Sequence, residues 1–511
     1  MSRVAQNRNT SLWIATTPEG EYPQLAGTVD VDVAIVGGGI TGLTTALLLK
    51  RAGRRVAVVE ARRAAFGTSG NTTAKLTSLH GLAYAAISAD HGPEAARLYG
   101  EANQAGIEQV AQLVDEYGIR CDFQRIPAYT YTTDVETAQK VEAEVAAARA
   151  AGLPASLVHE TPLPFPISAA VRFDEQALFH PRKYCLALAA AVNGGGSHVF
   201  ERTRAMNLEE RDGRQVVVAE TGEVVSDDVV VATLLPFDDP GLLLAKTTPI
   251  RSYALSAHLD GPVPDGMFLG IDEPSRSIRP HPLGDETVAV IAGESHRVGE
   301  GDDLESHFSA LESWSRRTFP VRSIDHRWSA QDYMPADGIP YVGRGAARLD
   351  HRFVATGFKK WGMSNGTAAA MLLRDLIIGR ENPWLAVFDS TRLKSAGDLK
   401  ELVKPIAYVT RRIIGDRLPS MEGPSATDLA PGQGAVVDRG GAKIACFRDE
   451  SGELRAFSAR CTHMGCIVHY NDAERSFDCP CHGSRFDSLG RVIEGPATAD
   501  LSSESLSETT T

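Results

Sequence analysis

The stretch Val31-Asp-Val-Ala-Ile-Val36 runs directly into Gly37-Gly-Gly-Ile-Thr-Gly42. The first six residues form an apolar run typical of a buried strand, and the apolar side chains that follow recur at helical spacing until Gly53. A second apolar run, Arg55-Val-Ala-Val-Val-Glu60, comes next. The pattern predicts a strand, a helix over residues 40–51 and a second strand, which together make a β-α-β unit.

The glycines between the first strand and the helix have the spacing Gly37-x-Gly39-x-x-Gly42, and Glu60 ends the next strand. The first glycine permits a tight turn, the second lets a pyrophosphate approach the backbone, and the third lets helix and strand pack closely. Glu60 would accept hydrogen bonds from ribose hydroxyls, which disfavours a 2′-phosphate. The motif predicts a dinucleotide site, and by itself it leaves FAD and NAD both open.

The composition is that of an ordinary globular protein with more than one domain. The chain has 511 residues, of which 43% are hydrophobic and 23% charged. The net charge of −13 gives no electrostatic footprint for nucleic acid. We expect no secretory signal, no membrane span and a cytoplasmic protein, because no apolar run is long enough for either segment.

The rest of the chain divides by pattern into three regions. Helices are expected at Pro93–Tyr117, Val135–Ala151 and Ser364–Ile378. Short β-branched runs between turns, over residues 160–340, predict a mixed sheet. A weakly patterned linker is expected at 401–425, and the short strands beyond it predict a small all-β domain.

Four of the seven cysteines lie in two short segments, Cys461-Thr-His463-Met-Gly-Cys466 and Cys479-Pro-Cys481-His482-Gly-Ser484. Two thiolates and two imidazoles suit a [2Fe–2S] cluster in which sulfur holds one iron and nitrogen the other. Zinc also accepts two cysteines and two histidines and stays open on this donor set. The other three cysteines, Cys121, Cys185 and Cys446, are expected to be structural.

These two segments resemble the cluster-binding loops of Rieske proteins of the respiratory bc-complex type. The resemblance implies that Cys461 and Cys479 ligate the inner iron, that His463 and His482 ligate an outer, solvent-facing iron, and that Cys466 and Cys481 form a disulfide. Such proteins follow the second ligand pair with Gly-Ser-x-Tyr, whereas this chain reads Gly483-Ser484-Arg485-Phe486. It keeps the serine donor and lacks the tyrosine.

Three further segments, at residues 67–81, 328–343 and 355–366, resemble the D-amino-acid-oxidase-like family, which includes glycine and sarcosine oxidases. The resemblance covers about residues 28–390 and implies FAD, which we expect to be bound non-covalently. Some relatives have a covalent flavin, and the alternative is that His80 touches or links to the ring. Lys360 and Met363 would then lie near the flavin, and Gly362 would allow its close approach. The full set expected to bind FAD is Gly37, Gly39, Gly42, Glu60, Thr68, Ser69, Gly357, Lys360, Gly362 and Met363.

The expected substrate region offers several polar side chains for a pocket, namely Arg125, Tyr129, Tyr131, Arg251, Tyr253, Arg279, His296 and Tyr333. An Arg–Tyr pair that binds a carboxylate would suit Arg251 with Tyr253. The weak catalytic candidates are Lys360, Arg251, Tyr253 and His80.

The expected fold is α/β, with a Rossmann-like FAD-binding domain, an inserted mixed-sheet substrate domain and a small all-β Rieske domain at the C-terminus. The oxidoreductase part would span residues 1–400, with FAD-binding segments at about 28–85, 165–240 and 335–395 and substrate segments at about 86–164 and 245–334. The Rieske domain would span residues 426–505.

The expected function is oxidation of a small molecule, an amine or amino acid, at FAD, with single electrons leaving through the cluster. The acceptor would be external, either a quinone or a redox protein with a basic face, since residues 421–511 count 8 Lys/Arg against 14 Asp/Glu. Two alternatives are an oxidase that uses oxygen and an electron-transfer or redox-sensing module without substrate turnover.

Overall fold

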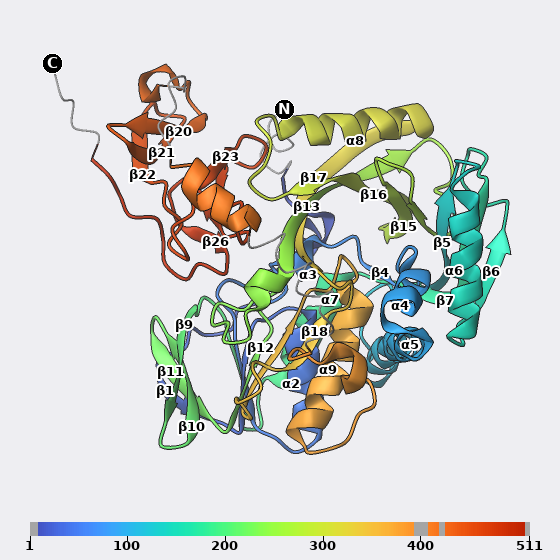
Figure 1. Cartoon of the computed structure of the whole chain (residues 1–511), viewed down its shortest axis with the longest axis horizontal. Coiled ribbons are helices and arrows are strands. Elements are labelled where there is room, and N and C mark those ends of the chain that lie inside the picture. The colour runs from blue at the N-terminus through green and yellow to red at the C-terminus, as the bar shows by residue number, and fades with distance from the viewer. Residues whose placement is uncertain (1–8, 393–406, 418–424, 506–511) are drawn as a thin grey trace.

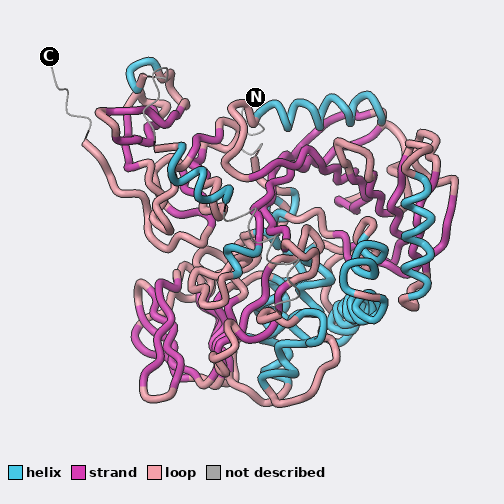
Figure 2. The backbone as a smooth tube through the Cα atoms, viewed as in Figure 1, coloured by secondary structure: helices cyan, strands magenta, loops and turns pink. Residues whose placement is uncertain are grey.

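The computed structural model describes residues 9–392, 407–417 and 425–505. Figures 1 and 2 show a large α/β part and a smaller β-rich part formed by the C-terminal residues, which lies against one side of it. Within the described residues no helix is both long and apolar enough to cross a bilayer.

The nucleotide-binding sheet has six strands in the order β18-β19-β12-β2-β3-β8. The β-α-β unit predicted from the sequence is confirmed, and its helix α2 is buried along residues 40–49 because the sheet and other helices cover it. Strand β18 runs antiparallel to β19, and the other neighbouring strands are parallel. The elements are β2 (Val33–Val36), α2 (Ile40–Arg51), β3 (Val56–Val59), β8 (His198–Phe200), β12 (Asp228–Val231), β18 (Tyr341–Arg344) and β19 (Arg352–Thr356).

A four-stranded sheet, in the order β1-β11-β10-β9, lies beside the nucleotide-binding sheet (Figure 1). Its apolar side chains share one core with those of β2, β3 and β12. The strands are β1 (Gly27–Asp30), β9 (Ala205–Arg211), β10 (Arg214–Ala219) and β11 (Gly222–Ser226).

The second large sheet has nine strands and confirms the predicted mixed sheet. Its order is β17-β13-β16-β15-β14-β5-β7-β4, and β6 pairs with β7. Strands β4 and β7 lie here, although their residues fall in segments expected to bind FAD. The strands are β4 (Lys75–Leu76), β5 (Gln124–Thr132), β6 (Ala155–Val158), β7 (Ala169–Leu178), β13 (Thr247–Leu259), β14 (Met267–Gly270), β15 (Ser277–Leu283), β16 (Glu286–Arg297) and β17 (Val321–Pro335).

The remaining helices cover the two large sheets. The expected helices at 93–117, 135–151 and 364–378 are confirmed as α5, α6 and α9, with ends that differ by one to three residues. The helices are α1 (Leu12–Ala15), α3 (Thr68–Asn71), α4 (Ala83–His91), α5 (Pro93–Glu116), α6 (Ala138–Ala150), α7 (Pro181–Val192), α8 (Glu305–Thr318), α9 (Gly362–Ile377) and α10 (Leu385–Phe388).

The C-terminal domain consists of two small antiparallel sheets, as expected. The expected linker contains a helix at residues 407–415, and its segments 401–406 and 418–424 lie outside the described residues. The strands are β20 (Gly434–Arg439), β21 (Ala442–Arg448), β22 (Leu454–Ser458), β23 (His469–Asn471), β24 (Ser476–Asp478), β25 (Arg485–Asp487) and β26 (Val492–Glu494).

Candidate cofactor sites and the contact between them

The glycine motif has the backbone geometry of a phosphate cradle. Gly37 has a φ of +115°, and its N–H donates to the Val59 carbonyl at 2.9 Å. A Cβ on Gly42 would lie 1.9 Å from the Gly37 carbonyl oxygen, so the helix approaches the turn too closely for any side chain. A Cβ on Gly39 would meet only the Ser69 hydroxyl, at 3.0 Å, and would otherwise fill the space in front of the helix N-terminus.

Backbone hydrogen bonds fix the Glu60 carboxylate at the end of β3. One carboxylate oxygen accepts the Gly38 N–H at 2.8 Å, and the other accepts the Arg62 N–H at 2.9 Å. Its position beside the glycine turn suits a ribose, because each oxygen still has a free lone pair.

A cavity of about 470 Å³ begins at this cradle and extends between the two large sheets. Its walls include seven of the expected FAD-binding residues besides Glu60, namely Gly37, Gly39, Thr68, Ser69, Lys360, Gly362 and Met363. Gly42 and Gly357 are not among its lining residues, since Gly42 packs under the turn. The glycine cradle, the fixed carboxylate and the size of the cavity fit a bound dinucleotide such as FAD.

His80 does not border this cavity. Its ring is buried, stacks on Trp361 at 4.8 Å and bonds to Tyr99 Oη at 2.6 Å and to the Thr77 carbonyl at 2.7 Å. Burial lowers the pKa of His80 to about 3. The ring is therefore neutral and packs against Trp361, which lines the cavity, so the contacts of His80 in the structure are those of a packing residue.

Two of the expected pocket residues, Tyr253 and Tyr333, line the cavity, and the others lie elsewhere. Tyr253 Oη bonds to His296 Nε2 at 3.0 Å, and the Lys360 amine donates to Ser295 Oγ at 2.6 Å. Arg125, Tyr129, Tyr131, Arg251, Arg279 and His296 are not among the described residues that line it.

Lys75 was missed in the sequence and lines the same cavity. Its amine donates to Ser277 Oγ at 2.9 Å and to Thr73 Oγ1 at 3.1 Å. Burial, together with the nearby Arg279 guanidinium, lowers the pKa of Lys75 to about 7. A lysine followed by Leu76-Thr-Ser carries no local signal of a cavity, because its position depends on the pairing of β4 with β7.

Arg251, the expected carboxylate anchor, lies in an ion pair and is not among the described residues that line the cavity. Its guanidinium is 2% exposed and donates to the Glu474 carboxylate through Nε at 2.6 Å and through Nη2 at 2.8 Å. Glu474 belongs to the C-terminal domain and also accepts a hydrogen bond from the Ser329 hydroxyl at 2.6 Å. Arg251 therefore joins the two parts of the protein, and its remaining nitrogen, Nη1, lies 3.6 Å from the Glu494 carboxylate of the C-terminal domain.

The four expected cluster ligands come together in the C-terminal domain. Cys461 and Cys479 are buried, are not in a disulfide and lie within hydrogen-bond contact of each other. The rings of His463 and His482 lie 5.2 Å apart. Among the described residues, the buried Nδ1 of His482 has no hydrogen-bond partner. Two facing thiols and two facing imidazoles, one with an orphaned nitrogen, fit a [2Fe–2S] cluster.

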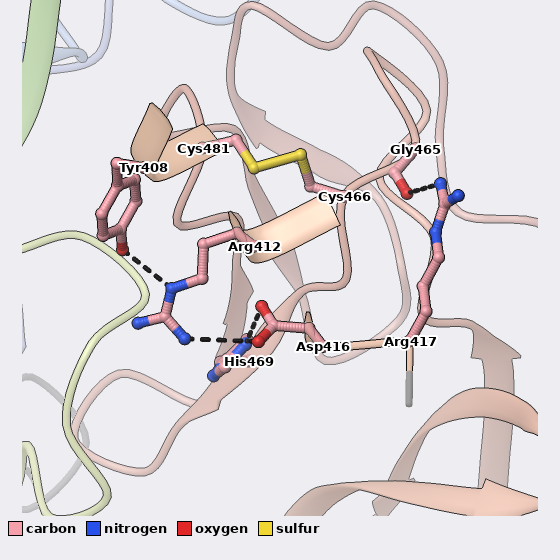
Figure 3. The surroundings of a disulfide bond; sticks show 8 residues. All are labelled: Tyr408, Arg412, Asp416, Arg417, Gly465, Cys466, His469 and Cys481. Atoms are coloured by element: carbon pink, nitrogen blue, oxygen red, sulfur yellow. Dashed lines mark hydrogen bonds and ion pairs between the residues drawn. A yellow bond between two sulfur atoms is a disulfide. The ribbon is translucent and has the colours of Figure 1, made fainter. Parts of the chain in front are cut away.

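The disulfide implied by the sequence joins the two ligand loops, between Cys466 and Cys481. Figure 3 shows the helix at 407–415 and the residues after it packed beside this disulfide, with Arg417 donating to the Gly465 carbonyl at 2.8 Å. The same helix reaches the oxidoreductase part, because Tyr408 donates to Glu300 at 2.6 Å. This contact was not predicted, since the sequence around the helix has no clear amphipathic pattern.

His482, which is expected to ligate the outer iron, is buried and in contact with the oxidoreductase domain, so the expected exposure to solvent is wrong for this residue. The side chain of His482 is buried, and its carbonyl accepts a hydrogen bond from the Tyr333 hydroxyl at 2.8 Å. The Gln331 amide donates to the next carbonyl, that of Gly483, at 2.8 Å. Both Tyr333 and Gln331 line the dinucleotide cavity. The other outer ligand, His463, is half-buried.

Phe486→Tyr should raise the reduction potential of the cluster. Ser484 already forms a hydrogen bond with the Cys461 sulfur, and the buried Phe486 stands at the sequence position of the tyrosine in the respiratory pattern. A hydrogen bond to a charged group is worth about 1.5–3 kcal/mol, which corresponds to roughly 60–130 mV for a one-electron couple. An EPR-monitored redox titration measures the shift, with Phe477→Tyr as a matched control. An unchanged or lower potential would contradict this assignment.

Comparison with known proteins agrees with both sites. The family model described as FAD dependent oxidoreductase matches residues 32–376, and the model described as Rieske [2Fe-2S] domain matches residues 422–505. A Bacillus subtilis (strain 168) protein named as a Rieske 2Fe-2S iron-sulfur protein, YhfW, is 36% identical over 97% of this chain and 98% of its own length.

Two further similarities each cover one part of the chain. The crystal structure of glycine oxidase from Geobacillus kaustophilus superimposes with a TM-score of 0.59 at 19% identity, covering 72% of this chain and 100% of that one. The cytochrome b6-f complex iron-sulfur subunit of Chlorobaculum tepidum is 40% identical over 81 residues, which are 14% of this chain and 45% of that protein. The first similarity shows the fold of the large part only.

Proposed function

The chain belongs to the FAD-dependent oxidoreductase family and carries a C-terminal Rieske [2Fe–2S] domain. From this premise we propose that the protein oxidises a small amine or amino acid and passes the electrons one at a time to an external acceptor. When bound, FAD supplies a two-electron acceptor for a C–N or C–H bond, and the cluster supplies a one-electron carrier.

The observation that carries this proposal is the hydrogen bond from the Tyr333 hydroxyl to the carbonyl of the cluster ligand His482. Tyr333 borders the FAD cavity, so one side chain separates the wall of one cofactor site from a ligand of the other. The Tyr333 side chain and the backbone of Gly483 lie close together, since a Cβ on Gly483 would lie 2.8 Å from Tyr333 Oη. This arrangement supports electron transfer within one chain.

Different residues of the cavity wall are assigned to nucleotide binding and to substrate binding. The glycine motif and Glu60 bind the nucleotide, and Met363 and Gly362 form the wall where α9 begins. We assign Lys360 and Tyr253 as the polar groups that contact the substrate in the cavity, because Arg251 forms an ion pair with Glu474 instead. Burial lowers the pKa of Lys360, although Asp332 and Glu273 oppose the shift.

An acceptor with a basic face suits the acidic C-terminal region, and a quinone is the second acceptor class that we propose. His463 and the exposed Met464 next to it offer the route out, since His482 faces inward. The acceptor would thus approach the cluster from the side opposite to the flavin.

Anaerobic screening of amines and amino acids tests the proposed reaction. A substrate is expected to bleach the flavin absorbance at a rate that saturates with its concentration, and Lys360→Met is expected to raise KM for that substrate. If protein that lacks the cluster consumed oxygen at the rate at which the intact protein oxidises the substrate, the protein would instead be an oxidase. If no compound bleaches the flavin, but the reduced cluster passes electrons to the flavin and bleaches it, the protein is an electron-transfer or sensing module.

A further inference from the structure

A segment of the Rieske domain, residues 493–498, lines the FAD cavity of the oxidoreductase domain. The same cavity wall contains Gly37 to Thr41 and Glu60 on one side and Ile493 to Thr498 on the other. The segment begins with the last two residues of β26 and has the sequence Ile493-Glu-Gly-Pro-Ala-Thr498. Two stretches more than 400 residues apart in the chain thus border one space.

The segment is held on the cavity side by contacts with the oxidoreductase domain. The Arg204 guanidinium, itself a lining residue, donates to the Val492 carbonyl at 3.0 Å, just before the segment. Burial lowers the pKa of Arg62, and the carboxylates of Glu494 and Glu60 oppose that shift. Arg62, Glu60 and Glu494 all line the cavity, so the segment borders the same space as the carboxylate that we assign to the ribose.

On its other side the segment is bonded to the cluster loops. The Ala497 N–H donates to Ser484 Oγ at 3.0 Å, and Ser484 bonds to the sulfur of the ligand Cys461. Arg485, in the same loop, donates to the Glu494 carboxylate at 3.2 Å. The cluster loops thus fix the position of the segment.

We propose that residues 493–498 are part of the FAD-binding site, so that the docked Rieske domain completes the site and retains the cofactor. The domain then has a binding role besides any part in electron transfer, and the proposal is independent of the substrate. Coupling of this kind is reciprocal, so bound FAD also holds the Rieske domain in its docked position.

Gly495→Val in the full-length protein tests the proposal. Chain neighbours aside, a Cβ on Gly495 would lie 3.8 Å from the Ala497 carbonyl oxygen, 3.9 Å from its nitrogen and within 4 Å of no other described atom. The protein therefore has room for the side chain, and Gly495 itself lines the FAD cavity. The matched control is Gly415→Val, in the helix at 407–415, where an added Cβ meets no atom of the described residues within 4 Å and the residue does not line the cavity.

The readouts are the Kd of FAD, from fluorescence titration of the deflavinated protein, and the EPR spectrum of the reduced cluster. Gly495→Val is expected to raise the Kd by roughly tenfold or more, equivalent to about 1.4 kcal/mol, with unchanged g-values. Gly415→Val is expected to change neither. A Kd within twofold of wild type for Gly495→Val, with the cluster intact, would overturn the proposal.

If Gly495→Val lacks the EPR signal of the cluster, a second variant, Ile493→Ala, tests whether the segment binds FAD. It removes apolar surface from the cavity wall without adding bulk, so the expected result is a severalfold higher Kd with a normal EPR spectrum. An unchanged Kd in this variant would contradict a binding role for the segment.

Discussion

Cys461→Ser is expected to abolish the EPR signal of the [2Fe–2S] cluster and to reduce turnover with an external acceptor to background. Cys461 is one of two buried thiols that lie within hydrogen-bond contact of each other, and the hydroxyl of the serine replacement is a poor iron ligand. With excess FAD present, substrate is still expected to bleach the flavin, because the glycine cradle lies in the other domain.

The matched control for this variant is Cys446→Ser, a buried free cysteine in the same domain that is not among the expected ligands. The control is expected to keep both the EPR signal and acceptor turnover. If Cys461→Ser turned over with the acceptor at the wild-type rate, the cluster would not be the exit route.

Arg251→Met is expected to weaken the docking of the Rieske domain by about 3 kcal/mol, the low end of the range for breaking a buried ion pair. The effect is at the low end because Arg485 and Ser329 still bond to Glu474. Urea titration followed by the visible circular dichroism of the cluster measures the loss. The rate of electron transfer from flavin to cluster is expected to fall in the same variant.

The control for Arg251→Met is Arg322→Met, which removes an ion pair with Glu286 between side chains that are 49% and 51% exposed. Exposed pairs contribute about 0–1 kcal/mol, so this variant is expected to resemble wild type. Equal losses in the two variants would contradict the docking role of Arg251. A higher KM with unchanged stability would restore Arg251 as the substrate anchor.

The charge on Glu474 also sets the pH range over which docking persists. Burial raises the pKa of this carboxyl, but the charges of Arg251 and Arg485 outweigh it and hold the pKa well below its ordinary value of 4.5. A carboxyl with a depressed pKa in the folded state contributes stability that is fully present above the unfolded value. The contribution of Glu474 is therefore present at neutral pH and is lost as the pH falls below 4.5.

Local patterns made both cofactor sites predictable from the sequence. The glycine spacing and the two cysteine–histidine segments each encode a site in a few adjacent residues, and helix α2 appears with the predicted ends. Glu60 was identified because the length of a β-α-β unit fixes where the second strand ends.

The contacts between the two domains could not be predicted, because they join residues far apart in the chain. Arg251 and Glu474 are 223 residues apart, and the alternation along β13 does not say whether a buried arginine meets a substrate or another domain. The inward position of His482 and the lining role of residues 493–498 depend on the same docking.

Electron transfer from flavin to cluster within one chain is tested most directly by rapid-freeze-quench EPR combined with stopped-flow absorbance in a single anaerobic turnover. We expect flavin bleaching first and the signal of the reduced cluster second, with a rate for the second step that does not change with protein concentration. A rate of cluster reduction that rises in proportion to protein concentration, or a cluster that is reduced before the flavin, would contradict this account.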